Sequence, residues 1–221
     1  MKKMVLFALC LAVCVTTFTG CAGIAETFEQ RSYAIDAREV AGICVDVRDR
    51  SIEVALSGDD QIHIAYYESV KEAYDIAVSD ERVLTMTPVI DKVWTDYIGV
   101  KPAAGYRKIT LSVPDALLGS LSLSTTNGNL SLPALTVLDE AELCSNGGDI
   151  VFDRLCAGSS IVLNVKNGSI TGTVAGGYDD YAMRCQTKKG ACNLPAEKTG
   201  GEKTLSVFAN NGDVNIAFTG E

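Results

Sequence analysis

The chain has 221 residues, of which 47% are hydrophobic, 21% charged and 7% aromatic. This composition indicates one globular domain with a sizeable core and excludes a disordered or collagen-like chain. Nineteen Lys and Arg against 28 Asp and Glu give a net charge of −9, which argues against a nucleic-acid partner. With one histidine, His63, and no residues at metal-ligand spacing, we expect neither imidazole catalysis nor a metal or other cofactor.

The first residues are typical of an exported protein. Two lysines precede an apolar run from Met4 to Phe18, which predicts a signal peptide over residues 1–20. The run is shorter than the roughly 20 apolar residues of a membrane span. Its end, Phe18-Thr19-Gly20-Cys21, resembles the bacterial lipobox, which implies a lipidated Cys21 and a protein held on the extracytoplasmic face of the cell membrane. Phe18 stands where Leu is usual, so cleavage to a free secreted protein is the alternative.

Residues 21–32 are expected to be a tether, and residues 33–221 the domain itself. Alternating apolar residues predict strands at 43–45, 52–54, 62–66, 73–78, 83–87 and 109–113. The segment 88–106 breaks the alternation and is expected to be an irregular, protruding insertion. Its aromatic residues Trp94, Tyr97 and Tyr106 are candidates for a binding surface, and the alternative is that they anchor the loop on the end of the core.

The second half of the chain contains an internal repeat of 20 to 22 residues. A glycine recurs in each unit, flanked by apolar residues seven and five positions before it and two and four positions after it. Gly172 is the exception among these flanking positions. Each unit therefore predicts a strand, a turn and a second strand, each strand with one apolar face. The repeat glycines are Gly128, Gly148, Gly168, Gly190 and Gly212.

Two architectures are compatible with this repeat. A fixed period suits stacked coils, in which equivalent residues lie about 4.8 Å apart. The sequence therefore predicts an all-β, single-stranded right-handed β-helix or β-roll solenoid of about 20–22 residues per coil, its handedness taken from the general preference of parallel crossovers. The Asn-Gly pairs at several turns are also typical of hairpins, so the alternative is an antiparallel β-sandwich or meander. Arg50 replaces the glycine in an earlier, imperfect unit.

The strand ending Ile109-Thr110-Leu111-Ser112-Val113-Pro114 and the later Asn-Gly and Gly-Asp repeats resemble the bacterial putative-adhesin family of domains of unknown function. The resemblance covers about residues 40–219. It implies a cell-envelope protein with a β-helical head and carries over no catalytic residues. The Lys189-Gly190-Ala191-Cys192 unit lacks the Asn and Asp of the others.

Several polar positions are candidates for a ligand site, each with a structural alternative. The residues that follow the repeat glycines, Asn129, Asp149, Ser169, Ala191 and Asp213, suit either ligand binding or turns that bond their own backbone. Asp179 and Asp180 resemble a carboxylate pair, but neighbours on a strand point to opposite faces, so solvated loop acids are preferred. His63 is expected at the surface. The cysteines after the leader are Cys44, Cys144, Cys156, Cys185 and Cys192, of which Cys185 and Cys192 suit buried thiols or one bridge.

Together these features predict a membrane-anchored envelope lipoprotein that acts as a non-catalytic, adhesin-like binding module. The expected partners are the membrane, through the lipid anchor, and an envelope protein or polysaccharide. One alternative is an accessory component of an envelope-stress sensing system. The other is a carbohydrate-active β-helix enzyme, which lacks support from a converging acid cluster.

Overall fold

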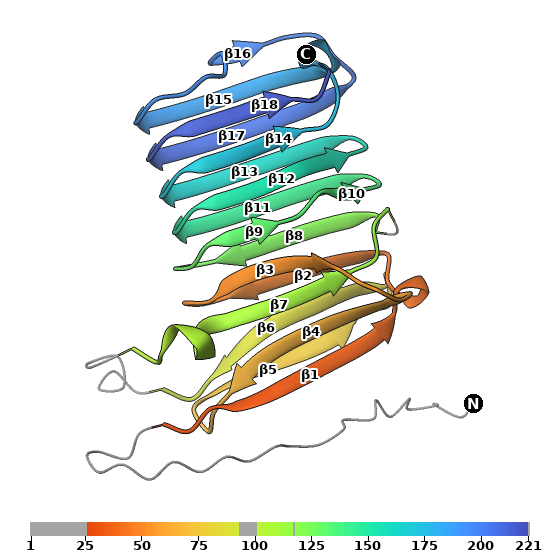
Figure 1. Ribbon diagram of the computed structural model, residues 1–221, viewed down its shortest axis with the longest axis vertical. Helices are drawn as coiled ribbons and strands as arrows, with labels where there is room; N and C mark the ends of the chain where they lie inside the picture. The colour runs from red at the N-terminus through yellow and green to blue at the C-terminus, as the bar shows by residue number, and fades with distance from the viewer. Residues whose placement is uncertain (1–25, 93–100, 117, 221) are drawn as a thin grey trace.

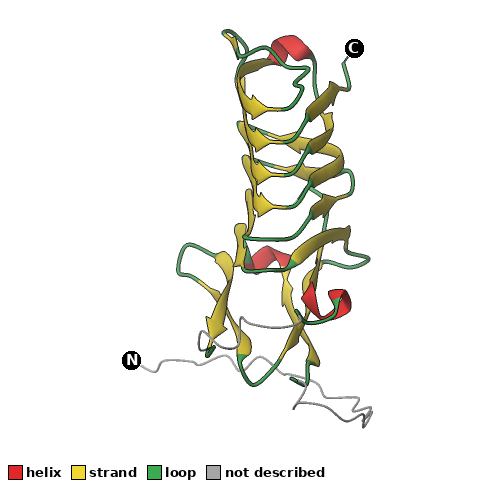
Figure 2. Cartoon of the chain, turned by 90° about the vertical axis from the view of Figure 1, so that its left-hand side faces the viewer, coloured by secondary structure: helices red, strands yellow, loops and turns green. Residues whose placement is uncertain are grey.

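The computed structural model describes residues 26–92, 101–116 and 118–220, which form two facing β-sheets of nine strands each (Figures 1 and 2). Sheet A contains β1 (Glu29–Asp36), β3 (Ser51–Leu56), β4 (Gln61–Glu68), β7 (Lys108–Val113), β9 (Leu130–Leu132), β10 (Leu135–Val137), β12 (Ile150–Ala157), β14 (Ile170–Val174) and β18 (Val214–Phe218). Sheet B contains β2 (Gly42–Val47), β5 (Glu72–Val78), β6 (Val83–Ile90), β8 (Ser120–Thr125), β11 (Glu140–Gly147), β13 (Ser160–Asn167), β15 (Tyr181–Lys189), β16 (Glu197–Lys198) and β17 (Lys203–Asn211).

The prediction of a single right-handed β-helix or β-roll is wrong. The two sheets are mixed and lie face to face in a sandwich-like arrangement, without a closed solenoid. Antiparallel pairs join β1 with β4, β4 with β7, β5 with β6 and β15 with β16, while the repeat strands pair in parallel. The chain also does not add its strands in sequence order, because β17 lies between β13 and β15. The alternative, an antiparallel β-sandwich or meander, is correct in the sandwich-like arrangement but wrong in the direction of the repeat strands.

The repeat determines which strands become neighbours. The turns at Gly128, Gly148, Gly168 and Gly212 each lead from a strand of sheet B to a strand of sheet A, as between β11 and β12, so the Asn-Gly turns do not close hairpins. The turn at Gly190 is followed only by an isolated bridge between Cys192 and Val214. Strands 20 residues apart then pair in register, with Ala141 beside Ile161 and Ile150 beside Ile170. The earlier, imperfect unit pairs in register with the first repeat unit, because Ile43 of β2 lies beside Leu121 of β8.

The core lies between the sheets and follows the alternation of each strand. In β8, Leu121 and Leu123 are buried, whereas the serines that alternate with them are partly exposed. The other repeat strands show a similar alternation. Gly172 breaks the apolar pattern because Phe152 on the neighbouring strand fills its space: an added Cβ would lie 2.4 Å from the Phe152 ring. The core is therefore continuous through this position.

In the described residues, three short 3-10 segments connect strands: η1 (Ala37–Glu39), η3 (Ala104–Arg107) and η4 (Tyr178–Asp180). Strand β6 continues to Ile90 and so includes the first residues of the segment that was expected to protrude. Within the described ranges, no helix has the length and hydropathy needed to cross a membrane.

Candidate functional site

The turns between the two sheets form a close-packed column. At Gly128, an added Cβ would lie 2.1 Å from the carbonyl oxygen of Arg50, and Gly148, Gly168 and Gly212 each meet the preceding member of the column in the same way. Glycine is required because each backbone approaches the next too closely for a side chain. Arg50 lies at the end of this column, beyond Gly128, and there a side chain is accommodated.

A ladder of hydrogen bonds runs beside the glycine column. The side-chain oxygen of Asn129 accepts from the Asp149 amide at 3.0 Å, and Asp149 accepts from the Ser169 amide at 2.8 Å. Ser169 accepts from the Asp213 amide, and Asp213 from the Ala191 amide. These side chains bond the backbone of the adjacent unit and not their own, so the column stabilises the stacking of the turns.

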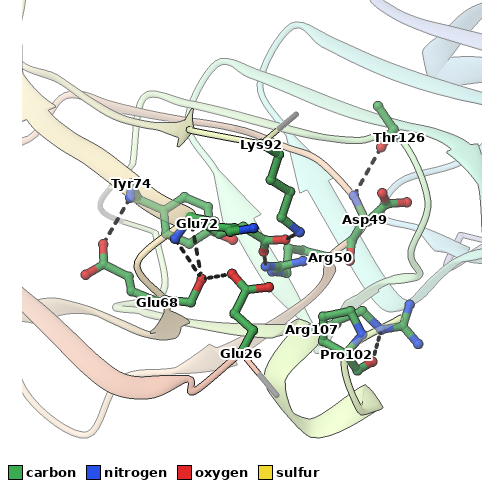
Figure 3. A network of polar contacts seen from close by, with 12 residues as sticks. Glu26, Asp49, Arg50, Glu68, Glu72, Tyr74, Lys92, Pro102, Arg107 and Thr126 are labelled. Atoms are coloured by element: carbon green, nitrogen blue, oxygen red, sulfur yellow. Dashed lines mark hydrogen bonds and ion pairs between the residues drawn. The ribbon is translucent and has the colours of Figure 1, made fainter. Parts of the chain in front are cut away.

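A cavity of about 740 Å³ lies beside Arg50, at the end of the molecule that contains β5 and β6. Its volume falls in the range of about 300–1,000 Å³ that is typical of small-ligand pockets. The β2–β3 turn forms one side and strands β5 and β6 another, with residues 101–107 completing the lining (Figure 3).

Three charged side chains form the base of this cavity. Arg50 is only 4% exposed, and Glu72 of β5 forms ion pairs with both Arg50 and Lys92. Arg50 also donates from Nη1 to the carbonyl oxygen of Asp49 at 3.2 Å. The Nε atom of Arg50 is buried and has no hydrogen-bond acceptor among the described residues. A buried donor without an acceptor costs roughly 1–3 kcal/mol, so this atom is a notable feature of the cavity.

Further charges surround the base. Among the described residues, the lining has five basic side chains, Arg48, Arg50, Lys92, Lys101 and Arg107, and three acidic ones, Glu26, Asp49 and Glu72. Lys101 lies 3.6 Å from Asp49. Arg107 donates from Nε to the Pro102 carbonyl at 2.9 Å, and in the described part of the chain neither Arg48 nor Arg107 forms an ion pair. The described lining therefore has more basic than acidic side chains, in a protein whose net charge is −9.

Aromatic and apolar groups line the rest of the cavity. Phe28 and Tyr106 stack with ring centroids 5.2 Å apart, and the Tyr106 ring also meets Tyr67 edge to face at 5.3 Å. On the opposite wall, Tyr74 packs edge to face on Tyr66. Burial raises the pKa of Tyr74, with Arg50 opposing the rise, so this phenol is neutral at physiological pH.

Only some of the residues that the sequence predicted as sites lie in the described part of the chain. Cys21, Trp94 and Tyr97 lie outside the described residues. Tyr106 lines the cavity, and it also packs η3 against Phe28 and against Tyr67 of β4. It therefore lies where a ligand could contact it, and it also anchors its own segment.

Sequence reasoning missed the buried charges. Arg50 had a detectable signal, because it replaces glycine at a position where every later unit has one. Glu72 and Lys92 had none, since their encounter with Arg50 depends on how β5 and β6 pair with β2.

The other polar candidates do not form a catalytic pair. Asp180 accepts from the Gly177 amide at 2.8 Å, whereas Asp179 is 95% exposed and lies 3.5 Å from Lys198. His63 is partly exposed, and its Nε2 lies 2.9 Å from Asp59. No group of three or more His, Cys, Asp or Glu side chains in the described part of the chain is placed to hold a metal ion.

The cysteines are free thiols in this structure. The sulfur atoms of Cys185 and Cys192 lie 2.8 Å apart. Burial raises the pKa of Cys185 to about 12 and that of Cys144 to about 11, so both are protonated near neutral pH and are poor nucleophiles.

The fold and cavity define an all-β, two-sheet protein with a ligand-sized cavity at one end. No family model matches the sequence, and no curated protein shows a significant match. Among solved structures, a putative cell adhesion protein from Clostridium sporogenes is similar, with a TM-score of 0.60 at 12% identity over 87% of this chain and 100% of that one. This likeness establishes a shared fold.

Two further structures are more distant. A putative adhesin from Bacteroides fragilis has a TM-score of 0.37 at 14% identity, covering 88% of this chain and 98% of that one. A putative lipid binding protein from Parabacteroides distasonis has a TM-score of 0.31 at 13% identity, covering 85% and 96%. The Clostridium sporogenes and Bacteroides fragilis structures have adhesion-related names, whereas the Parabacteroides distasonis structure does not.

Proposed function

We propose that this protein is a non-catalytic binding module of the cell envelope, and that it holds its ligand in the cavity beside Arg50. The observation that carries the proposal is the buried Arg50, whose Nε lacks an acceptor among the described residues while it lies in a cavity of ligand size. Buried polar groups are normally satisfied, and an exception in a concave site is a candidate ligand contact.

The lining supports binding more than catalysis. Arg50 and Lys92 are cations, Glu72 is held between them, and Tyr74 has a raised pKa. A general base that turns over near neutral pH needs an accessible group with a suitable pKa, and this set offers mainly fixed charges and an apolar wall. The arrangement is suited to orienting a ligand.

Export and anchoring through Cys21 form part of the proposal, and the lipobox-like end of the leader supports them. Glu26 lines the cavity and follows Cys21 by five residues, so an extended tether would place it within about 18 Å of the lipidated cysteine. The cavity would then work close to the membrane surface and the inner wall.

Anchoring is tested by labelling intact cells with a palmitate probe. The protein is expected to carry the label and to sediment with membranes, and Cys21→Ala is expected to lose the label and enter the soluble export fraction. Equal labelling of both proteins would contradict the anchor.

Ligand binding is tested by cosedimentation of the purified protein with isolated wall sacculi. Ala73→Trp places a large ring in the cavity and is expected to reduce binding at least about tenfold, because it excludes the ligand. The matched control Ala217→Trp puts the same ring on an exposed position of β18. Binding that is absent, or unchanged by Ala73→Trp, would overturn the cavity as the site.

A further inference from the structure

The cavity chemistry defines the class of ligand, given that the cavity is the binding site as proposed above. At its base, Glu72 forms ion pairs with both Arg50 and Lys92. Arg50 donates from Nη1 to the Asp49 carbonyl and from Nη2 to Glu72, whereas its buried Nε has no acceptor among the described residues. An anionic oxygen is the acceptor that a buried guanidinium donor prefers.

The carboxylates in the lining restrict which chemical groups the rest of the ligand can carry. Glu26 and Asp49 bring carboxylates to the same lining, and each carboxylate has about four acceptor sites. Their contacts with described residues use only part of this capacity, since Glu26 accepts from Ser69, while Asp49 accepts from Asn127 at 2.6 Å and lies 3.6 Å from Lys101. A hydrocarbon chain would desolvate these acids without bonding them, which is costly, whereas hydroxyl groups would donate to them.

The third feature is the apolar wall. Tyr74, Pro88 and Ile90 line one side, and Pro102 and the Tyr106 ring, which is stacked on Phe28, line another. Flat, apolar surfaces of this kind suit the C–H face of a sugar ring, while the polar groups at the base suit its hydroxyl edge.

We infer that the cavity binds an acidic saccharide, with a sugar carboxylate received by Arg50 Nε and hydroxyl groups donating to Asp49 and Glu26. Arg48 and Arg107, which lack ion pairs among the described residues, attract the anion to the cavity. A neutral sugar of the same shape offers Arg50 Nε no anionic oxygen, so it binds more weakly.

Calorimetric titration of the purified protein tests the inference with three probes: digalacturonate, galactobiose and a soluble short-chain phosphatidylglycerol. We expect digalacturonate to bind at least about tenfold more tightly than galactobiose, and its affinity to fall as salt is raised. Equal binding of the two sugars, no binding of digalacturonate, or tighter binding of the phospholipid would overturn the inference.

Variants separate the roles of the residues. Arg50→Lys keeps the charge but removes Nε, and it is expected to lose most of the preference for digalacturonate. Arg107→Gln and Arg48→Gln alter more accessible residues and keep the inference testable if Arg50→Lys does not fold; each is expected to weaken digalacturonate binding about fivefold. Arg154→Gln, at an exposed position of β12, is the matched control and is expected to leave digalacturonate binding unchanged.

The two proposals fail in different ways. If Ala73→Trp abolishes sacculus binding but the calorimeter shows no preference for the acidic sugar, the cavity is the site and the ligand class is wrong. If Ala73→Trp leaves sacculus binding unchanged, the proposed function itself is wrong.

Discussion

At the scale of single residues, the repeat glycines have a steric role. At Gly212 the backbone has φ of +146°, and an added Cβ would lie 1.9 Å from the Gly168 carbonyl oxygen. The obstacle is backbone, which cannot move aside as a flexible side chain can. These glycines therefore determine how closely the turns stack.

Gly212→Ala is expected to destabilise the protein by about 2–4 kcal/mol, from backbone strain and the displacement of the Gly168 turn. Urea unfolding measures the change. The matched control is Gly58→Ala, since nothing lies within 4 Å of a Cβ there, and its effect should be small. Similar unfolding midpoints for the two variants would refute the steric argument.

Asp59 gives the protein a specific response to acid. Hydrogen bonds from Ser57, His63 and the Gln61 amide lower the pKa of Asp59 from 3.8 to about 2. Because the folded pKa is lower, the ionised carboxylate stabilises the fold above pH 3.8, and this contribution is lost as the pH falls toward 2.

Ser57→Ala removes the largest cause of the shift, so the pKa of Asp59 should rise toward 3.8 and the loss of stability between pH 4 and pH 2 should become smaller. Carboxyl chemical shifts followed by NMR during acidification report the pKa directly. The control Ser131→Ala changes an exposed serine of β9 and should leave the Asp59 titration as it is. An unaltered Asp59 pKa in Ser57→Ala would contradict this assignment.

At the scale of strands, much of the structure could be predicted from the sequence. Alternation placed strands such as β4, β7 and β13 because one face of each is buried, and the period of the glycines matched the register between neighbours. These patterns did not predict which strands become neighbours at the two ends of the molecule. The insertion of β17 beside β13, and the parallel pairing of β6 with β2, depend on long-range pairing that leaves no local signal.

The same limit explains the candidate site. Arg50 interrupts the glycine column and could be noticed, but its partner Glu72 comes from β5, which pairs only with β6 at the edge of sheet B. The aromatic residues of the insertion were considered from their type alone. One of these residues, Tyr106, lies in the lining, and sequence reasoning missed the charges beside it.

Packing between adjacent strands can be tested at Gly172, which sits opposite the Phe152 ring. Gly172→Val restores the apolar repeat but overfills this space, and we expect a loss of about 1–3 kcal/mol. In the Phe152→Val background the same substitution should cost much less, because the smaller side chain leaves room. A double-mutant cycle from urea unfolding measures the coupling, and additive effects would contradict the complementary packing of these two positions.

At the scale of the whole molecule, the strand order makes distant parts of the chain depend on one another. Sheet B places β2 beside β8 and β17 between β13 and β15, so segments far apart in sequence share a ladder. In sheet A, β18 pairs with β14, and Val214 also bridges to Cys192. β17 is therefore an interior strand of sheet B, whereas β18 is the last strand in the order of sheet A (Figure 1).

Removal of residues 203–221 tests this arrangement. The deletion takes β17 and β18, and β15 then loses its parallel partner while β13 and β14 each lose a neighbour. We expect hydrogen exchange to show that amides of β13, β14 and β15 lose protection, because their inter-strand bonds and the covering apolar residues Leu205 and Val207 are gone. Amides of β2 and β8, which lie beyond β11 in sheet B and do not pair with the deleted strands, serve as the internal control and should remain protected. Retained protection of β15 would show that this strand does not depend on β17, and the interlocked order would then contribute little to stability.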